Sequence, residues 1–485
     1  MTKRQPDRIP VQAAIQAMLC RATAQETRFP GLIRKESSNQ GTDMKHRAKA
    51  DPAEPVEDPP AEPEEVTRSL FNGGVLSAFG ERDYSYLWTG ALISNIGTWV
   101  QTAALLWLIK NILHSNSWVG AVNMANFLPV LFIVPFAGSL ADRYSRRWLI
   151  IIGQTVMMLG AFALGITASF HVDSKPIILI TVAIIGVAFA FNFPAWQAIL
   201  PDMVRREDML NAIALSSAQW NLARFIGPVI GAAILTYFSP ATAFYANAVS
   251  FLFVLGALLI IHPKMGAIEK PSETITQQIG QGFTYVWHRK WMVNILIALG
   301  LVSLFGFSYI VLIPSLIQDV LHGGAGRYGF LLGMTGLGAV IGAPLVTYLT
   351  RYYKERNIVK ASMLGLGLFL LAFAWSRAYW LSCLISIGLG ACFLITSAAT
   401  NSVLQGCSDR EMRGRVISIY IMVFIGVAAL GGQLMGYISD VRSTPFSLFV
   451  GGLACIAVAL VLIAFPKLIK DAVTVECQPP YEPWD

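Results

Sequence analysis

The chain has 485 residues, of which 55% are hydrophobic and only 13% are charged, and its formal net charge is +7. Soluble globular domains carry about 25% charged residues, so this composition excludes an ordinary soluble protein and indicates that lipid surrounds most of the chain. The basic residues occur in short loops between apolar runs rather than on one face, which argues against nucleic acid as a partner. The six cysteines show no CxxC pair and no metal-ligand spacing. We therefore expect neither a metal nor a cofactor.

Residues 1–80 differ in composition from the rest of the chain. Proline and acidic residues dominate the segment 49–65, which has too little apolar surface to offset the entropy lost on ordering. We expect this region to be a disordered cytoplasmic tail.

From Tyr84 onward, the sequence contains runs that are long enough to cross a hydrocarbon layer about 30 Å thick. They are apolar throughout, without the two-residue alternation of barrel strands, so the sequence predicts helices. The twelve expected spans are 86–110, 117–140, 147–170, 176–199, 211–237, 240–261, 291–318, 327–350, 357–376, 378–405, 415–438 and 445–466.

The loops between these spans differ in charge. If both termini are cytoplasmic, the internal cytoplasmic loops hold sixteen Lys or Arg residues and the external loops hold four. Short loops rich in Lys and Arg stay on the cytoplasmic side, so this difference predicts the orientation.

The chain also repeats itself at an offset of 204 residues, which relates Gly138 to Gly342, Arg147 to Arg351 and Gly227 to Gly431. We therefore predict an all-α membrane protein of twelve transmembrane helices in two six-helix pseudo-repeats, with a substrate site near the midplane where the halves meet. The expected parts are a tail (1–80), a first bundle (81–261), a central loop with an amphipathic helix (262–290), a second bundle (291–466) and a cytoplasmic C-terminal tail (467–485).

Residues 138–147, Gly-Ser-Leu-Ala-Asp-Arg-Tyr-Ser-Arg-Arg, resemble the signature of the loop between helices 2 and 3 in the major facilitator superfamily. Other segments resemble the enterobactin-exporter and macrolide-efflux branch of this superfamily. They are residues 194–201, 211–215 and 221–228, together with Arg413 and Arg415 after Leu404-Gln405. The resemblance covers residues 80–466. It implies efflux of a bulky organic molecule, energised by protons, across a prokaryotic cytoplasmic membrane.

The same resemblance assigns a gate to the signature loop, through Gly138, Asp142, Arg143 and Arg146. An acid at a helix end suits a cap on the amino terminus of another helix, with Arg146 as its ion-pair partner. In the second repeat Val346 replaces the acid, so we expect two unequal gates. The alternative is a basic loop, including Arg147, that only sets topology.

Arg224 lies thirteen residues past Asn211, or about 20 Å along a helix, too deep for easy snorkelling. It could attract an anionic or catecholate-like substrate, or it could be a structural arginine bonded to helix carbonyls. Gly227, Pro228 and Gly231 follow it and resemble a shortened antiporter motif. Their spacing, repeated in Gly338 and Gly342 and in Gly432 and Gly436, suits either helices that rock between the halves or ordinary tight packing.

Polar side chains also mark several expected helices near the midplane. We expect Asn95, Gln101, Asn192, Gln197 and Asn401 to line the substrate cavity, where amides and aromatic rings suit a mixed polar and aromatic ligand. Hydrogen bonds between helices are the alternative for each of them.

An exporter, a membrane enzyme and a membrane sensor each require different sequence features. An enzyme requires clustered catalytic groups, which the helices lack, and a sensor would tolerate eroded gate motifs, whereas the first motif is nearly intact. We expect an exporter of a siderophore-like molecule, with a multidrug or macrolide pump as the alternative. Protons and membrane lipid are further expected partners.

Overall fold

The computed structural model describes residues 76–141, 143–172, 174–261, 274–409 and 411–472. All of them belong to one compact unit, Ala61–Asp485. Of the tail expected over residues 1–80, residues 1–75 lie outside the described residues. The same is true of Asp142 and of the last thirteen residues of the chain, 473–485.

The first half of the bundle contains six long helices. A short 3-10 helix, η1 (Ser77–Gly80), precedes them, and two more 3-10 turns, η2 (Leu200–Asp202) and η3 (Arg206–Asp208), connect the fourth to the fifth. The six helices are α3 (Arg82–Leu113), α4 (Asn116–Ala141), α5 (Arg146–Ser169), α6 (Lys175–Ile199), α7 (Met209–Tyr237) and α8 (Pro240–Ile260).

The second half follows a separate helix, α9 (Ile275–Trp287). Two of its six spans are interrupted. The first of these consists of α10 (Lys290–Phe305), α11 (Tyr309–Ser315) and the π-turn η4 (Leu316–Val320). The second consists of α15 (Arg413–Ile421), the π-turn η5 (Met422–Gly426) and α16 (Val427–Val441). The others are α12 (Ala325–Tyr352), α13 (Glu355–Trp375), α14 (Tyr379–Gly406) and α17 (Thr444–Ala464), after which comes η6 (Pro466–Ala472).

Eleven of these spans are long and apolar enough to cross a membrane by length and composition. The twelfth is α7, which has 29 residues but carries Gln219, Asn221 and Arg224 in its middle. The prediction of twelve helices in two six-helix repeats is confirmed.

Two boundaries differ from the sequence prediction. η1 lies within the segment 1–80 assigned to a tail, yet Ser77 and Ala78 are buried and the Asn211 amide donates a 2.7 Å hydrogen bond to Ser77 Oγ. At the other end of the chain, η6 lies largely within the expected tail 467–485, but Ile469 is buried and the Asn294 amide donates to the Leu468 carbonyl at 3.0 Å. Both turns belong to the folded part because each covers apolar surface at a helix end.

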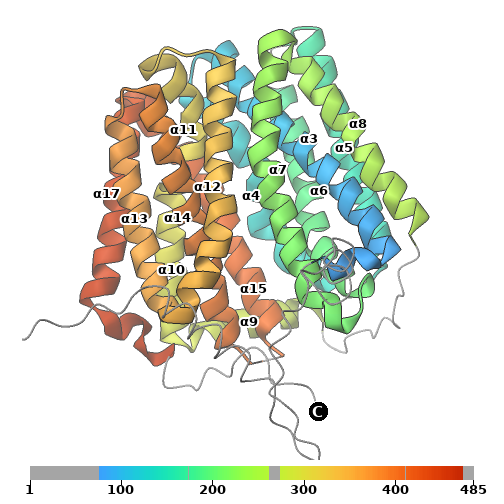
Figure 1. The fold of residues 1–485 in the computed structure, drawn as a ribbon, viewed down its shortest axis with the longest axis vertical. Helices are drawn as coiled ribbons and strands as arrows, with labels where there is room; N and C mark the ends of the chain where they lie inside the picture. The colour runs from blue at the N-terminus through green and yellow to red at the C-terminus, as the bar shows by residue number, and fades with distance from the viewer. Residues whose placement is uncertain (1–75, 142, 173, 262–273, 410, 473–485) are drawn as a thin grey trace, which may run out of the picture. The chain divides into compact units, whose positions relative to one another are not determined.

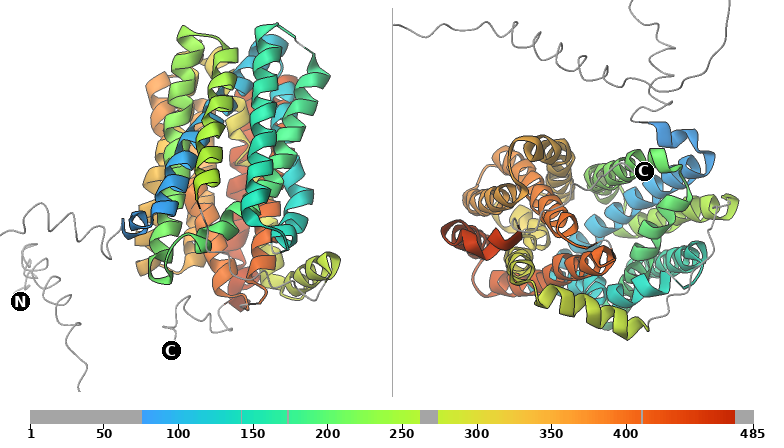
Figure 2. Two further views of the ribbon diagram at one scale, coloured as in Figure 1. Left: turned by 90° about the vertical axis from the view of Figure 1, so that its right-hand side faces the viewer. Right: turned by 90° about the horizontal axis from the view of Figure 1, so that it is seen from below.

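The six helices of each half form one group around a buried apolar core. The halves meet along two helix pairs, α7 with α12 and α4 with the span of α15, η5 and α16. Figure 1 shows α7 and α12 side by side, and the view along the helices in Figure 2 separates the two groups.

The helix α9 lies across one end of this bundle (Figures 1 and 2). We call that end, where α4 also leads into the Arg-rich segment 143–147, the basic end. The opposite end, where α3 leads into α4 and α16 into α17, is called the far end.

Local sequence explains several helix boundaries. Ser239 and Ser443 each accept a backbone hydrogen bond as N-caps, and a proline follows within two residues, where its missing N–H costs nothing. Thr274 and Gln277 form a capping box that begins α9. At the break before α11, close packing against α17 requires Gly306, because a Cβ there would lie 2.6 Å from Cys455 Sγ.

Candidate functional site

The contact between α7 and α12 depends on three glycines of α12 that face α7. A Cβ on Gly329 would lie 2.4 Å from the Pro228 carbonyl oxygen, and one on Gly336 would lie 2.5 Å from the Arg224 carbonyl oxygen. Gly333 faces Val229 and the Phe225 carbonyl between them. The absence of side chains therefore brings the two halves together at the level of Arg224.

The glycines singled out from the sequence have different neighbours. Gly227 and Gly231 pack against α3 at Trp99 and Ala103, inside the first half. Gly338 and Gly342 pack against α14, inside the second half, and α7 continues as one helix through Pro228. By contrast, Gly432 and Gly436 face α4 at Asn123 and Asn116 and so lie between the halves.

Arg224 is only 5% exposed, at the junction of the two halves. Its guanidinium lies 4.3 Å from the ring centroid of Phe393 on α14 and 5.6 Å from that of Trp99 on α3. Its Nε and Nη2 atoms have no hydrogen-bond partner. Cation–π contacts and the neighbouring Tyr309 hydroxyl compensate part of the desolvation cost, while Nε and Nη2 keep donor capacity for a ligand.

Aromatic rings from both halves surround this arginine. In the first half Trp99 packs edge-on against Trp220 at 6.3 Å between centroids. In the second half Phe393 contacts Phe307 at 4.4 Å and Phe424 at 5.5 Å. The indole N–H of Trp99 also has no partner. Aromatic rings of both halves and unpartnered donors therefore lie together at this junction, and small-molecule sites combine such groups.

Two of the five amide residues predicted to line the cavity lie buried within the first half. Gln101 accepts a 2.8 Å hydrogen bond from Asn247 of α8. Asn192 packs against Gly153 of α5, with its side-chain oxygen buried and unpartnered.

The other three are more accessible. Asn401 accepts a 3.0 Å hydrogen bond from Gln405 on its own helix, whereas Asn95 is half-buried and Gln197 is exposed. The interhelical alternative therefore describes Gln101 best.

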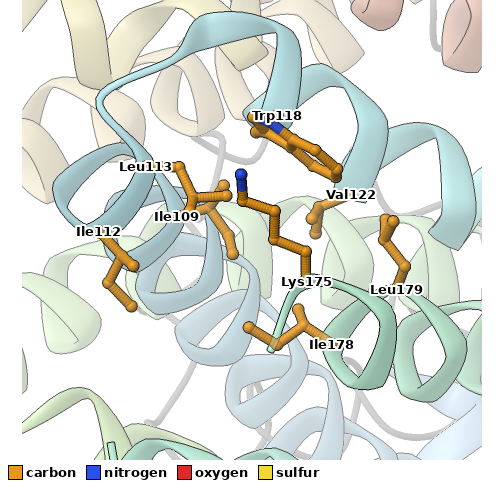
Figure 3. Close-up of a pocket in the computed structure, with 8 residues that line it drawn as sticks. All are labelled: Ile109, Ile112, Leu113, Trp118, Val122, Lys175, Ile178 and Leu179. Carbon is orange, nitrogen blue, oxygen red and sulfur yellow. The ribbon is translucent and has the colours of Figure 1, made fainter. Parts of the chain in front are cut away.

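Two small cavities lie inside the first half. One is lined by the polar side chains of Gln101, Thr102, Asn123 and Asn126, together with apolar residues of α3, α4 and α6. The other lies nearer the far end, where the ammonium group of Lys175 lies 4.8 Å from the ring centroid of Trp118 among apolar side chains (Figure 3). The first, with a volume of about 20 Å³, has room for a water molecule, which its amide groups can bind.

The signature loop at the basic end is held by its arginines. Arg146 forms an ion pair with Asp202 at 2.9 Å and donates to the Ala198 carbonyl at 2.9 Å, and its expected partner Asp142 lies outside the described residues. Arg147 donates to the Leu258 and Leu259 carbonyls at 2.7 and 3.0 Å, which caps the carboxyl end of α8.

The remaining residues of the predicted gate lie at the same end. Arg143 follows Asp142, which is outside the described residues, and Gly138 faces Ser418 of α15. Arg413 donates to the Ser408 carbonyl at 3.3 Å, and Arg415 donates to Gln281 of α9.

The central helix α9 is docked on the second half by a second set of polar contacts. Arg289 stacks over Tyr285 at 3.5 Å from the ring centroid and pairs with Asp409 at 3.2 Å, and the Asp409 N–H donates to the Tyr285 hydroxyl at 3.0 Å. Burial raises the pKa of Tyr285, so the phenol stays neutral as an acceptor.

Sequence reasoning missed a polar network at the far end, where Lys110 pairs with Asp319 at 2.9 Å across the two halves. The only signal was a lysine near the end of an apolar run. No group of three or more His, Cys, Asp or Glu residues within the described ranges is arranged to hold a metal ion.

Comparison with known proteins identifies the family. The model of a family described as transmembrane secretion effector, one of the major facilitator families, matches residues 74–483. The chain belongs to this family. The relatives of this transporter include the staphyloferrin A transporter of Staphylococcus aureus, 27% identical over 390 residues that cover 79% of this chain and 96% of the relative. Macrolide efflux protein A of Streptococcus pyogenes is 20% identical, and the match covers 77% of this chain and 94% of the relative.

Solved structures show the same fold. The nucleoside transporter NupG superimposes with a TM-score of 0.65 at 16% identity, covering 79% of this transporter and 99% of NupG. An inward-facing, unoccupied bacterial homologue of the human lysosomal transporter Spinster has a TM-score of 0.62 at 12% identity. The match covers 83% of this transporter and 99% of that homologue. The major facilitator fold expected from the sequence is therefore confirmed.

Proposed function

We propose that this transporter exports a bulky organic molecule rich in anionic or strongly hydrogen-bond-accepting oxygens, as a siderophore is, by alternating access across a bacterial cytoplasmic membrane. The observation that carries the proposal is Arg224, a buried cation with two unpartnered donor groups between aromatic rings of both halves. A charge at this depth needs a partner or a cavity. The two oxygens of a carboxylate would accept from Nε and Nη2 in a planar, bidentate arrangement.

The relatives support this cargo class. One of them is a staphyloferrin A transporter, and others are named as macrolide or multidrug efflux proteins. The second candidate is thus a multidrug pump, which the aromatic lining of Trp99, Trp220 and Phe393 favours because rings bind varied apolar cargo.

The orientation and the energy source are part of the proposal. We place the basic end in the cytoplasm because its loops hold most of the basic residues. Lipid surrounds the bundle, and the small organic cargo passes between its halves. Proton coupling rests on the superfamily resemblance, since the acids of the spans, such as Asp319 and Asp440, lie at helix ends.

The test compares efflux and binding of a hydroxycarboxylate siderophore, a catecholate siderophore and a neutral macrolide by wild-type protein, Arg224→Lys and Arg224→Gln. We expect Arg224→Gln to weaken binding of the anionic cargo by about tenfold to a hundredfold, the usual range for a hydrogen bond to a charged group. Arg224→Lys should keep part of the affinity because it keeps the charge but loses the planar fork. The macrolide should be affected least.

Arg327→Gln is the matched control, because Arg327 also stacks on an aromatic ring, Tyr379 at 5.4 Å, but lies exposed near the far end. Thermal stability is measured for every variant. If Arg224→Gln binds and exports the anionic cargo as wild type does, or if both Arg224 variants lose stability and bind all three compounds equally weakly, the arginine is structural and the proposal fails.

A further inference from the structure

An ion pair joins the two halves at the far end. Lys110, in the last turn of α3, donates to Asp319 Oδ2 at 2.9 Å and to Asn116 Oδ1 at 3.1 Å. The Lys110 side chain is 6% exposed, whereas that of Asp319 is 50% exposed. Lys110 belongs to the first half and Asp319 to the π-turn η4 of the second, so this pair bridges the halves and reaches solvent through its acid.

A second acid from the second half caps a helix of the first. Asp440, near the end of α16, accepts hydrogen bonds from the backbone N–H groups of Asn116 at 2.7 Å and Ser117 at 2.9 Å. The Ser115 hydroxyl donates to the same carboxylate at 2.6 Å. The first N–H groups of a helix have no partner within it, and a nearby acid usually supplies one. Here the acid lies more than 300 residues away in the chain, so the cap of α4 exists only while the halves are together.

The side chain of Asn116 links these two contacts. Its amide donates to Ser439 Oγ at 2.7 Å, and its oxygen accepts from Lys110 and from Ser315. Gly436 permits the approach, because a Cβ there would lie 2.4 Å from the Asn116 carbonyl oxygen. Residues of four spans thus share one hydrogen-bonded network.

The other ion pairs between described residues have a different arrangement. Three of them lie within the first half: Arg146–Asp202, Arg205–Glu81 and Arg205–Glu207. A fourth pair, Arg289–Asp409, joins the end of α9 to the second half. All four lie at the basic end. Among these pairs of described residues, Lys110–Asp319 crosses between the halves.

We propose that Lys110, Asp319 and Asp440 form the gate that holds the far end shut in this state and must separate for cargo to leave there. The inference rests on the proposed orientation, in which the far end is external. Such a contact suits a reversible gate because water can replace its hydrogen bonds on opening, so the net cost of separation is modest. Asp440 also couples opening to the helix α4, whose amino terminus loses its cap when the halves part.

The gate is tested by amide hydrogen exchange on the full chain in lipid nanodiscs without cargo. Asp440→Ala and Asp319→Asn should raise the rate of amide exchange by about tenfold at the far ends of α7 and α12, residues 228–237 and 325–336. This factor corresponds to the loss of about one helix cap or ion pair from the shut state. Exchange at the basic ends of the same helices should fall. Arg205→Gln, which removes an exposed ion pair inside the first half, is the control and should change neither region.

A charge reversal distinguishes a gate from a local cap. Lys110→Glu alone should open the far end, and Lys110→Glu combined with Asp319→Lys should restore the wild-type exchange pattern. If the effect of Asp440→Ala stays within residues 115–120, or the double variant remains as open as the single one, the proposal is overturned. Asp440→Asn keeps an acceptor oxygen for one N–H and provides a folded comparison should Asp440→Ala not fold. Because no cargo is present, these outcomes are independent of the Arg224 test.

Discussion

Gly336→Ala tests the closest approach between the two halves. A Cβ at this position would lie 2.5 Å from the Arg224 carbonyl oxygen and 2.6 Å from the Phe225 Cα atom. Non-bonded carbon atoms are optimally about 3.5–4.0 Å apart, so α12 and α7 would have to separate by roughly 1 Å. Forcing an extra carbon into a packed contact costs about 1–3 kcal/mol.

The net effect is smaller than the overpacking cost, because alanine favours a helix over glycine by up to about 1 kcal/mol. We expect a net loss of about 1–2 kcal/mol in the stability of this contact, seen as a fall of a few degrees in the unfolding temperature. The initial rate of efflux should also fall, because this contact is part of the interface along which the halves move.

Gly256→Ala is the matched control, because Gly256 lies in α8 and no heavy atom lies within 4 Å of its added Cβ. It should be neutral or slightly stabilising. Gly227→Ala separates the two interfaces, since its Cβ would lie 2.4 Å from Trp99 Cβ inside the first half. That variant should lose stability without changing the far-end exchange pattern. If Gly336→Ala unfolds and transports as Gly256→Ala does, the interpretation of the α7–α12 contact is wrong.

Two further predictions concern parts of the chain outside the described residues. Asp142→Asn should cripple efflux and leave membrane insertion intact, because insertion depends on the basic residues of the loop; normal efflux at equal expression would refute it. A chain beginning at Thr67 should still insert and transport, because the Pro- and acid-rich segment before it lies outside every span; loss of activity at an unchanged protein level would show that the tail contributes to transport.

Much of the architecture follows from the sequence because the membrane restricts it so strongly. Every backbone polar group in lipid must be satisfied internally, so an apolar run of about 20 residues has to be a helix. The repeat that relates Gly138 to Gly342 indicated two halves before any contact was known. A buried arginine in an apolar setting, Arg224, was likewise visible as a residue that needs an explanation.

Tertiary structure decided which residues meet across the halves. Glycine spacing marks close approach but not the partner, so the sequence does not show that Gly338 and Gly342 face α14 whereas Gly329 and Gly336 face α7. Asp440 looked like a polar residue at the end of a span, yet it caps α4 from more than 300 residues away. Helical periodicity describes one helix at a time, whereas an interface depends on the rotation and depth of two helices, which only packing determines.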